Sequence, residues 1–287
     1  MRKADRTMNT GKRILLLAIM FLGINVLDAS ALTIVTRSIG GAAPANIAGG
    51  GNLDDIVNAA AKIWESAYSD SLVLTIYYGW GPSGDAGTHM VQEMDSTGRE
   101  ISGLITLDNS GRTPLYLDPT PNSNEEYRRR TEEYQDLGSG YVNVARIFSS
   151  PSGSAAGRID LLSVVIHEIG HALGMSSGNA RFRAQSPNGI LTVSQSYPFA
   201  GSIIPLAYNN SGIVPHFDTS EMVYGSVMSG VNGDERRLPS QVDILANAQI
   251  SGFSLALSRT EAMGAIRHPD PVIGSGIQSR VALSGGR

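Results

Sequence analysis

The pattern His-Glu-x-x-His, at residues 167–171, constrains this chain more than any other stretch. Residues four apart lie on one face of an α-helix, so His167 and His171 can reach the same metal ion. Glu168 is rotated by about 100° from His167 around the helix axis. Its carboxylate can therefore lie beside the ion without binding it, which suits a base acting on a metal-bound water. The alternative is a pair of core histidines that are satisfied by backbone carbonyl groups.

The residues around this pattern predict a buried helix that begins after Asp160 and ends near Gly174. The intervening residues are apolar almost all round, which is typical of a helix without a solvent-exposed face. Asp160 can cap the N-terminus, and Gly174 can end the helix in a left-handed conformation. Two histidines on a buried helix need polar partners, and a metal ion supplies one.

Residues 1–31 predict an export signal. Five basic residues precede an apolar run from Ile14 to Leu27, and Ala29-Ser30-Ala31 fits the small-x-small cleavage rule. The run is short for a membrane span. We therefore expect cleavage after Ala31 and a secreted or periplasmic protein without a membrane anchor; the alternative is an uncleaved anchor.

Composition restricts the partners and the kind of metal site. The chain has 287 residues and no cysteine, which excludes disulfides and thiolate zinc sites. Cleavage at residue 31 would remove five basic and two acidic residues from totals of 22 and 26, leaving a formal net charge of −7. That charge argues against nucleic acid or anionic lipid as a partner.

Hydrophobic periodicity predicts helices and strands on both sides of the metal helix. Apolar spacing and end signals predict helices at 52–67 and 239–251, with Trp64 in the core. Apolar runs predict strands at 32–35, 72–78, 101–107, 115–117 and 141–148. Residues 176–210 are rich in Ser, Asn, Gly and Pro, so we expect irregular structure with short strands at 190–193 and 202–206.

The segment 122–136 is dense in charge and contains Arg128-Arg129-Arg130. Three adjacent arginines suit an anion site. Because acidic residues are interspersed with them, a solvated helical face or loop is the favoured prediction.

A catalytic zinc usually has three protein ligands and a water, so a third ligand is needed. Residues 167–174 resemble the compact metzincin motif His-Glu-x-x-His-x-x-Gly-x-x-His, but the last position is Ser177, a poor ligand. The downstream His216 and the sequence around Met228 resemble the leishmanolysin-type metzincins, whose third histidine follows a long insertion and precedes a methionine turn. The whole chain also resembles uncharacterised secreted bacterial metalloproteases.

Other residues remain open for these roles. His216 could be a surface histidine, with Asp218 or Glu221 as the third ligand, and Met228 could be ordinary core. His89 and His268 lie in polar stretches and are predicted to be non-ligands. Tyr224 is a weak candidate for stabilising an oxyanion.

The metzincin resemblance implies an α+β fold. It has a mixed twisted sheet with two helices in the upper half, and an irregular lower half with a Met-turn and a final helix. We expect a catalytic domain at 32–254 and a loosely ordered tail at 255–287. In metzincins the substrate pairs with an exposed edge strand, which would lie near Leu115 or in the preceding segment.

The predicted function is that of an exported zinc-dependent endopeptidase acting on proteins or peptides. His167, His171 and His216 would hold Zn²⁺, and Glu168 would be the general base for a water on the metal. The alternative is a secreted, non-catalytic module in which zinc ties two halves together. Substrate preference, calcium binding, the mode of activation and the oligomeric state do not follow from the sequence.

Overall fold

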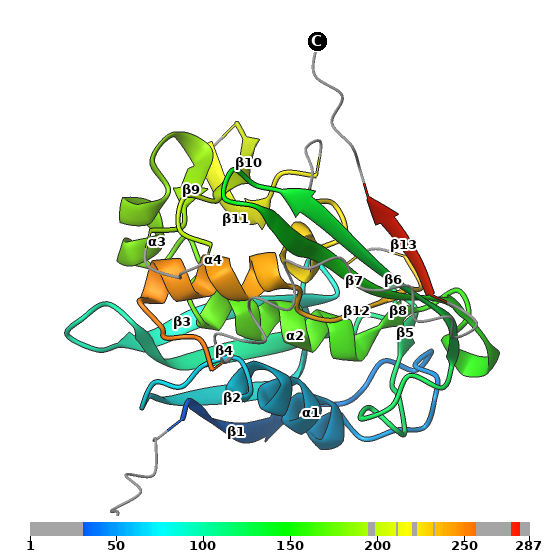
Figure 1. Ribbon diagram of the computed structural model, residues 1–287. Coiled ribbons are helices and arrows are strands. Elements are labelled where there is room, and N and C mark those ends of the chain that lie inside the picture. Colours follow the sequence, from blue (N-terminus) through cyan, green and yellow to red (C-terminus); the bar gives the residue numbers. More distant parts are fainter. Residues whose placement is uncertain are drawn as a thin grey trace, which may run out of the picture.

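The computed structural model describes residues 31–194, 199–210, 212–219, 223–231, 233–256 and 277–281, the last of these by its backbone. The predicted export signal lies outside these residues except for Ala31, and so does most of the tail predicted from residue 255. Within the described part, each helix lacks the length or the apolar character of a membrane span. The architecture is α+β, with helices α1–α4 and several small sheets (Figure 1).

The main sheet is mixed and four-stranded. In spatial order its strands are β1 (Thr33–Gly40), β2 (Val73–Gly81), β4 (Glu100–Asp108) and β3 (Gly87–Met94). The first three are parallel, whereas β3 pairs antiparallel with β4 and forms one edge. The strands predicted at 32–35, 72–78 and 101–107 correspond to β1, β2 and β4.

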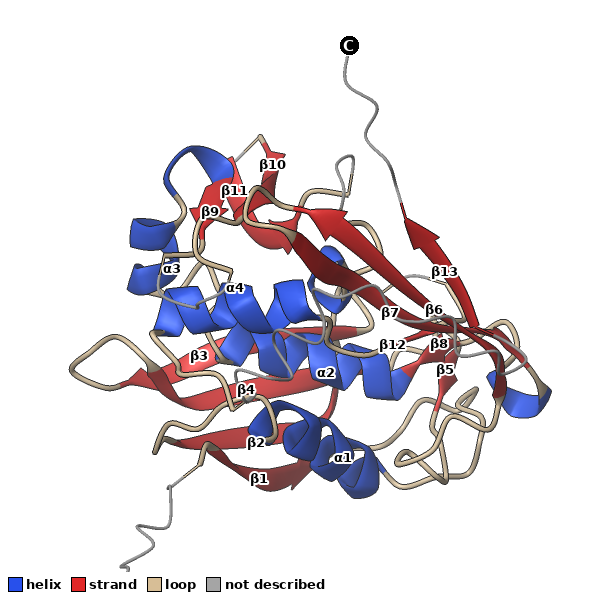
Figure 2. Ribbon diagram, viewed as in Figure 1, coloured by secondary structure: helices blue, strands red, loops and turns tan. Residues whose placement is uncertain are grey.

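Helices α1 (Leu53–Glu65) and α2 (Leu161–Ala172) pack against each other and against this sheet (Figure 2). Every second residue of β2 is buried, which gives the sheet an apolar face for the helices. Asn52 caps α1 by accepting a hydrogen bond from the backbone N–H of Asp54 at 2.9 Å. Trp64 is fully buried, as predicted, and its indole N–H donates to the carbonyl of Ile166 in α2 at 2.9 Å.

The other half of the molecule contains three further sheets, of four, three and two strands. The first consists, in spatial order, of β12 (Arg236–Arg237), β7 (Tyr141–Pro151), β6 (Tyr127–Asp136) and β13 (Ile277–Val281). The second consists of β11 (Gly212–Phe217), β10 (Ile203–Asn209) and β9 (Ile190–Thr192). The third is the pair of β5 (Leu115–Tyr116) and β8 (Ile159–Asp160). The strands predicted at 141–148, 190–193 and 202–206 correspond to β7, β9 and β10.

Helix α4 (Gln241–Ser251) packs against β7. It is the predicted last helix, and the predicted capping box between Ser240 and Asp243 is present. The remaining helical segments are short: α3 (Ala180–Gln185) and the 3₁₀ turns η1 (Gly153–Ala155), η2 (Pro187–Gly189) and η3 (Val227–Ser229).

The charged segment 122–136 is not a helix or a loop, because its larger part forms strand β6. Its charges are matched across the β6–β7 pair instead of along a helix. Glu132 lies opposite Arg146 with an N–O distance of 3.7 Å and also pairs with Arg130. The prediction was wrong because the stabilising partner strand follows later in the chain and no periodicity within the segment reveals it.

Three further expectations need correction. Leu115 belongs to the separate β5–β8 pair and not to the main sheet, whose two edge strands are β1 and β3, and β3 was not predicted as a strand. Strand β2 runs through Gly81, three residues beyond the end of the strand predicted at 72–78. Helix α2 is capped at Leu173 in a right-handed conformation, and Gly174 has a φ of +153° outside the left-handed helical region.

The N-terminus of α2 is held by a buried ionic network. Asp160 caps the helix, accepting from the Ser163 backbone N–H at 3.0 Å. The guanidinium of Arg236 donates to both carboxylate oxygens of Asp160, at 2.9 and 3.0 Å, and to the carboxylate of Asp118. All three side chains are inaccessible to solvent. This network fixes the start of the helix that carries the His-Glu-x-x-His pattern.

Candidate metal centre

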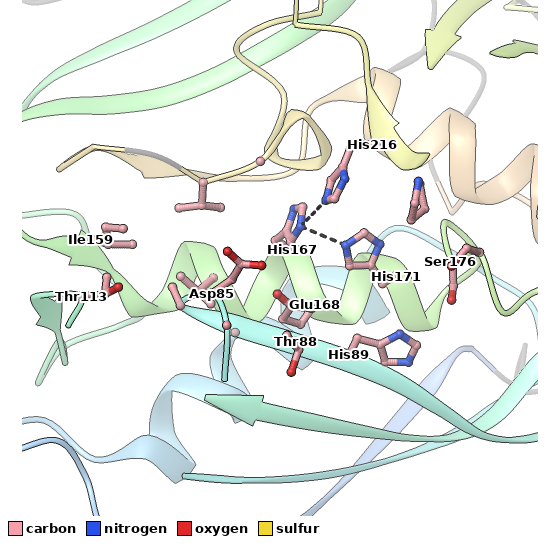
Figure 3. A pocket seen from close by; sticks show the side chains of 18 residues that line it. Asp85, Thr88, His89, Thr113, Ile159, His167, Glu168, His171, Ser176 and His216 are labelled. Carbon is pink, nitrogen blue, oxygen red and sulfur yellow. Dashed lines mark hydrogen bonds between the residues drawn. The ribbon is translucent and has the colours of Figure 1, made fainter. Parts of the chain in front are cut away.

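Three imidazole rings converge between the two halves of the molecule (Figure 3). His167 and His171 project from one face of α2, and His216 reaches them from β11. The Nε2 atom of His167 lies 3.0 Å from that of His171 and 3.1 Å from that of His216. In a tetrahedral zinc site with Zn–N distances of about 2.0–2.1 Å, neighbouring nitrogens are roughly 3.3 Å apart. The spacing is therefore compatible with a shared metal ion.

The second nitrogens of the two helix histidines fix their tautomers. The Nδ1 atom of His167 lies 2.8 Å from the carbonyl oxygen of Val227, and that of His171 contacts the carbonyl oxygen of Met175. A carbonyl only accepts, so both Nδ1 atoms must donate a proton. Both Nε2 atoms then present lone pairs to the same point. This is the arrangement of metal-binding histidines, in which the second nitrogen donates to a protein oxygen.

Burial keeps these rings in the neutral form that binds metals. Desolvation lowers the pKa of His167 to about 3, with a smaller contribution from His216. Burial also lowers the pKa of His171 well below its ordinary value, and it lowers the pKa of His216. Three neutral imidazoles suit zinc and other divalent transition metals. These ligands are therefore compatible with a metal ion, but they do not identify which metal binds.

Met228 packs against the helix between the two histidines. It lies in η3, is fully buried, and its sulfur is so close to Gly170 that a Cβ there would lie 2.4 Å away. Its backbone N–H donates to Asp243 of α4 at 2.9 Å. The neighbouring Val227 supplies the carbonyl that orients His167, so the turn at Met228 ties α2 to α4 and supports one of the three rings.

Glu168 faces the cavity in which the three histidines meet. This cavity has a volume of about 590 Å³ and lies between α2, the start of β3 and the end of β11. Burial raises the pKa of Glu168 to about 8, and the negative charge of Asp85 adds to the rise. A Cβ at Gly87 of β3 would lie 3.1 Å from the Glu168 Oε1 atom, so the small residue leaves room for this carboxylate.

His89, predicted to be a non-ligand in a loop, lies on β3 beside the cavity. It is outside the group of three, because its Nε2 atom pairs with the buried carboxylate of Glu100 at 2.7 Å. Its ring is 6.3 Å from that of His171, centroid to centroid. Side chains of β3 alternate between its two faces, but the apolar Met90 is on the exposed face and the polar His89 on the inner one, so the apolar–polar pattern of a strand is absent from the sequence.

The other candidates are distributed as follows. Asp218 is outside the group of three, as far as the described residues go, and its backbone N–H donates to Pro205 at 3.1 Å. Glu221 and His268 lie outside the described residues. Tyr224 is exposed, with the guanidinium of Arg237 5.4 Å from its ring centroid, and it does not line the cavity. Ser177, at the position of the histidine in the compact motif, lines the cavity.

No model of a known protein family matches this chain, and no curated protein is detectably similar to it. What is established is a buried three-histidine cluster, compatible with a metal site, in an α+β fold.

Proposed function

We propose that this protein is a zinc-dependent endopeptidase that is exported after removal of residues 1–31. The observation that carries the proposal is the position of Glu168. This buried carboxyl group shares one cavity with the three converging histidines and stands next to one of them in the sequence. A site that only stabilises a fold has no use for an acid–base group there.

His167, His171 and His216 would hold the zinc ion. When bound, zinc would polarise the carbonyl of the scissile peptide bond and lower the pKa of a coordinated water. Glu168 would accept a proton from the attacking water and pass it to the nitrogen of the leaving amine. In the metal-free protein burial raises the pKa of Glu168 to about 8, and a bound zinc ion would favour the carboxylate form that accepts the proton.

The substrate would bind as an extended strand along β3. This strand is the edge of the main sheet next to the cavity, and Gly87, Thr88 and His89 line the cavity. An exposed edge offers unpaired backbone N–H and C=O groups to a peptide in extended conformation. The proposed substrates are therefore proteins or peptides. The acidic mature chain argues against nucleic acid.

The resemblance to metzincins supports this function through several separate features. The main sheet has parallel strands and one antiparallel edge, and two helices cover it. Met228 lies beneath α2, and α4 follows it in the chain. The long interval between His171 and His216 contains β9, β10 and most of β11, as an insertion before the third histidine would.

The alternative, a non-catalytic zinc-stabilised module, predicts a closed site with four protein ligands. Among the described residues the group contains three histidines, and it borders a cavity. An open fourth position is a feature of catalytic zinc sites, so this observation favours the enzyme.

The decisive comparison uses the mature chain and its Glu168→Ala variant. Zinc content would be measured by elemental analysis, and cleavage by release of fluorescent peptides from labelled casein. We expect the variant to retain zinc and to lose cleavage by about 10²-fold or more. Equal cleavage by the two proteins would refute the proposal.

Two further variants test the third ligand. His216→Ala should lose zinc, whereas Asp218→Ala should retain it, because the Asp218 carboxylate is outside the histidine group. The reverse result would transfer the ligand role to Asp218. Zinc bound by wild type without any proteolysis would favour the non-catalytic module.

A further inference from the structure

The cavity of the candidate metal centre has an acidic wall. Asp85 lies on the short loop that leads from β2 into β3, and it lines the cavity together with Glu168 and His216. Figure 3 shows it beside Glu168 and His167. Its side chain is exposed, so a molecule that enters the cavity meets a solvated carboxylate next to the three rings.

Within the described part of the chain, no lysine or arginine side chain forms an ion pair with Asp85. No lysine or arginine is among the described residues that line the cavity. Asp85 lies two residues before Gly87, whose backbone borders the Glu168 carboxylate, so the loop places a second carboxylate at the same cavity. A solvated carboxylate at the mouth of a cavity attracts a cationic group of an entering molecule and repels an anionic one.

The direction of β3 indicates which part of a substrate Asp85 would meet. Gly87, at the start of β3, lies beside Glu168, and His89, further along, lies beside His171. A peptide that pairs antiparallel with β3, the more stable pairing, runs the opposite way. Its residues after the scissile bond then approach the start of β3, where Asp85 lies two residues before Gly87.

We propose that Asp85 is a specificity-determining residue that selects a lysine or arginine within the first few residues after the scissile bond. This inference rests on the proposed function. A cationic side chain there would lie in the mouth of the cavity and pair with the Asp85 carboxylate. An acidic side chain in the same place would be repelled by Asp85.

The test measures binding as well as cleavage. The probes are otherwise neutral fluorescent peptides that carry a single Lys or Glu at each of the three positions after the cleaved bond. A second set carries the charge at the far N-terminal end. Cleavage is measured with zinc-loaded wild type, and binding by anisotropy with the zinc-loaded Glu168→Ala variant. Each protein is compared with its counterpart carrying Asp85→Asn or Asp85→Lys.

We expect Lys peptides to be preferred over Glu peptides by roughly threefold to tenfold, the effect of one partly solvated ion pair. Asp85→Asn should abolish the preference, and Asp85→Lys should reverse it. The matched control is Glu93→Gln, which removes the same charge from an exposed position on β3 outside the cavity and should keep the preference.

A preference that survives in Asp85→Asn would overturn the role of Asp85. So would an equal effect of the charge at the far N-terminal end, which would indicate attraction by the net charge alone. Neutral peptides cut by wild type would keep the proposed function in place in either case. Charge-dependent binding without any cleavage would refute the protease, and with it the assignment of Asp85 to residues after a scissile bond.

Discussion

Glu168 is the residue on which the chemistry of the site depends, and its protonation is tied to its surroundings. The carboxyl group is buried and close to the charge of Asp85, so without a metal its pKa rises from 4.5 to about 8. A zinc ion held by the neighbouring histidines would act in the opposite direction, because a nearby cation favours the carboxylate. Metal binding and ionisation of Glu168 should therefore support each other.

The raised pKa of Glu168 predicts how the stability of the metal-free protein depends on pH. Between the unfolded pKa of 4.5 and the folded pKa of about 8, the folded state binds a proton that the unfolded state has released. The free energy of unfolding contributed by this group is therefore highest at low pH. It is lost as pH rises, by up to about 1.4 kcal/mol per pH unit.

Glu168→Gln isolates this contribution. Urea denaturation of the chelator-treated proteins should show similar stabilities near the lower pKa. The variant should become progressively more stable than wild type toward about pH 8, because glutamine does not ionise. Added zinc should reduce the difference in free energy of unfolding between Glu168→Gln and the wild type. Parallel stability curves across this pH range would contradict the assigned environment of Glu168.

At the scale of elements, a helix or strand could be predicted when the residues that stabilise it lie close together in the sequence. Helices α1, α2 and α4 were predictable because their caps and apolar stripes lie within each segment. His167, Glu168 and His171 were predictable for the same reason, since helix geometry relates them. His216 required the family resemblance.

The elements and contacts that were missed depend on distant partners. Strand β3 is stabilised by pairing with β4, and β6 by pairing with β7. Neither β3 nor β6 shows a regular alternation of apolar and polar residues. The pairing of His89 with Glu100 and the approach of Asp85 to Glu168 follow from those strand positions, so residue spacing alone could not reveal them. The sequence showed Asp160 as a helix cap but not its pairing with Arg236.

That last contact gives a prediction for α2 as an element. Arg236→Met would leave the carboxylates of Asp160 and Asp118 buried without their guanidinium partner. Loss of one partner from a buried ion pair costs about 3–5 kcal/mol. The helix would lose its anchored N-terminus, and zinc affinity should fall together with stability.

Chemical denaturation and zinc titration of Arg236→Met would measure both effects. Arg128→Met is the matched control, because Arg128 is exposed on β6 and should change stability by less than about 0.5 kcal/mol. A variant of Arg236 as stable as this control would show that the network contributes nothing to holding the helix.

At the scale of the whole molecule, the three histidines come from two different parts of one shared core. Helix α2 packs on the main sheet, whereas His216 belongs to the three-stranded sheet of β9, β10 and β11. A metal bound by all three would cross-link these parts. This cross-link would be confined to the cavity. Loss of the metal should therefore make β11 more mobile without unfolding the main sheet.

Metal removal therefore has a defined expected outcome. A ligand that binds only the folded state, at about a thousandfold excess over its Kd, stabilises that state by about 4 kcal/mol. Treatment of the wild type with a zinc chelator should lower its Tm, and added zinc should restore it.

His216→Ala removes one of the three donors, so its Tm should resemble that of the chelated wild type and respond little to the chelator. Ser177→Ala is the control, because it changes a residue of the cavity wall that donates nothing to the histidine group, and it should respond as wild type does. Equal chelator sensitivity of wild type and His216→Ala would mean that any stabilising metal binds without the ring on β11, and the cross-link between the two sheets would not exist.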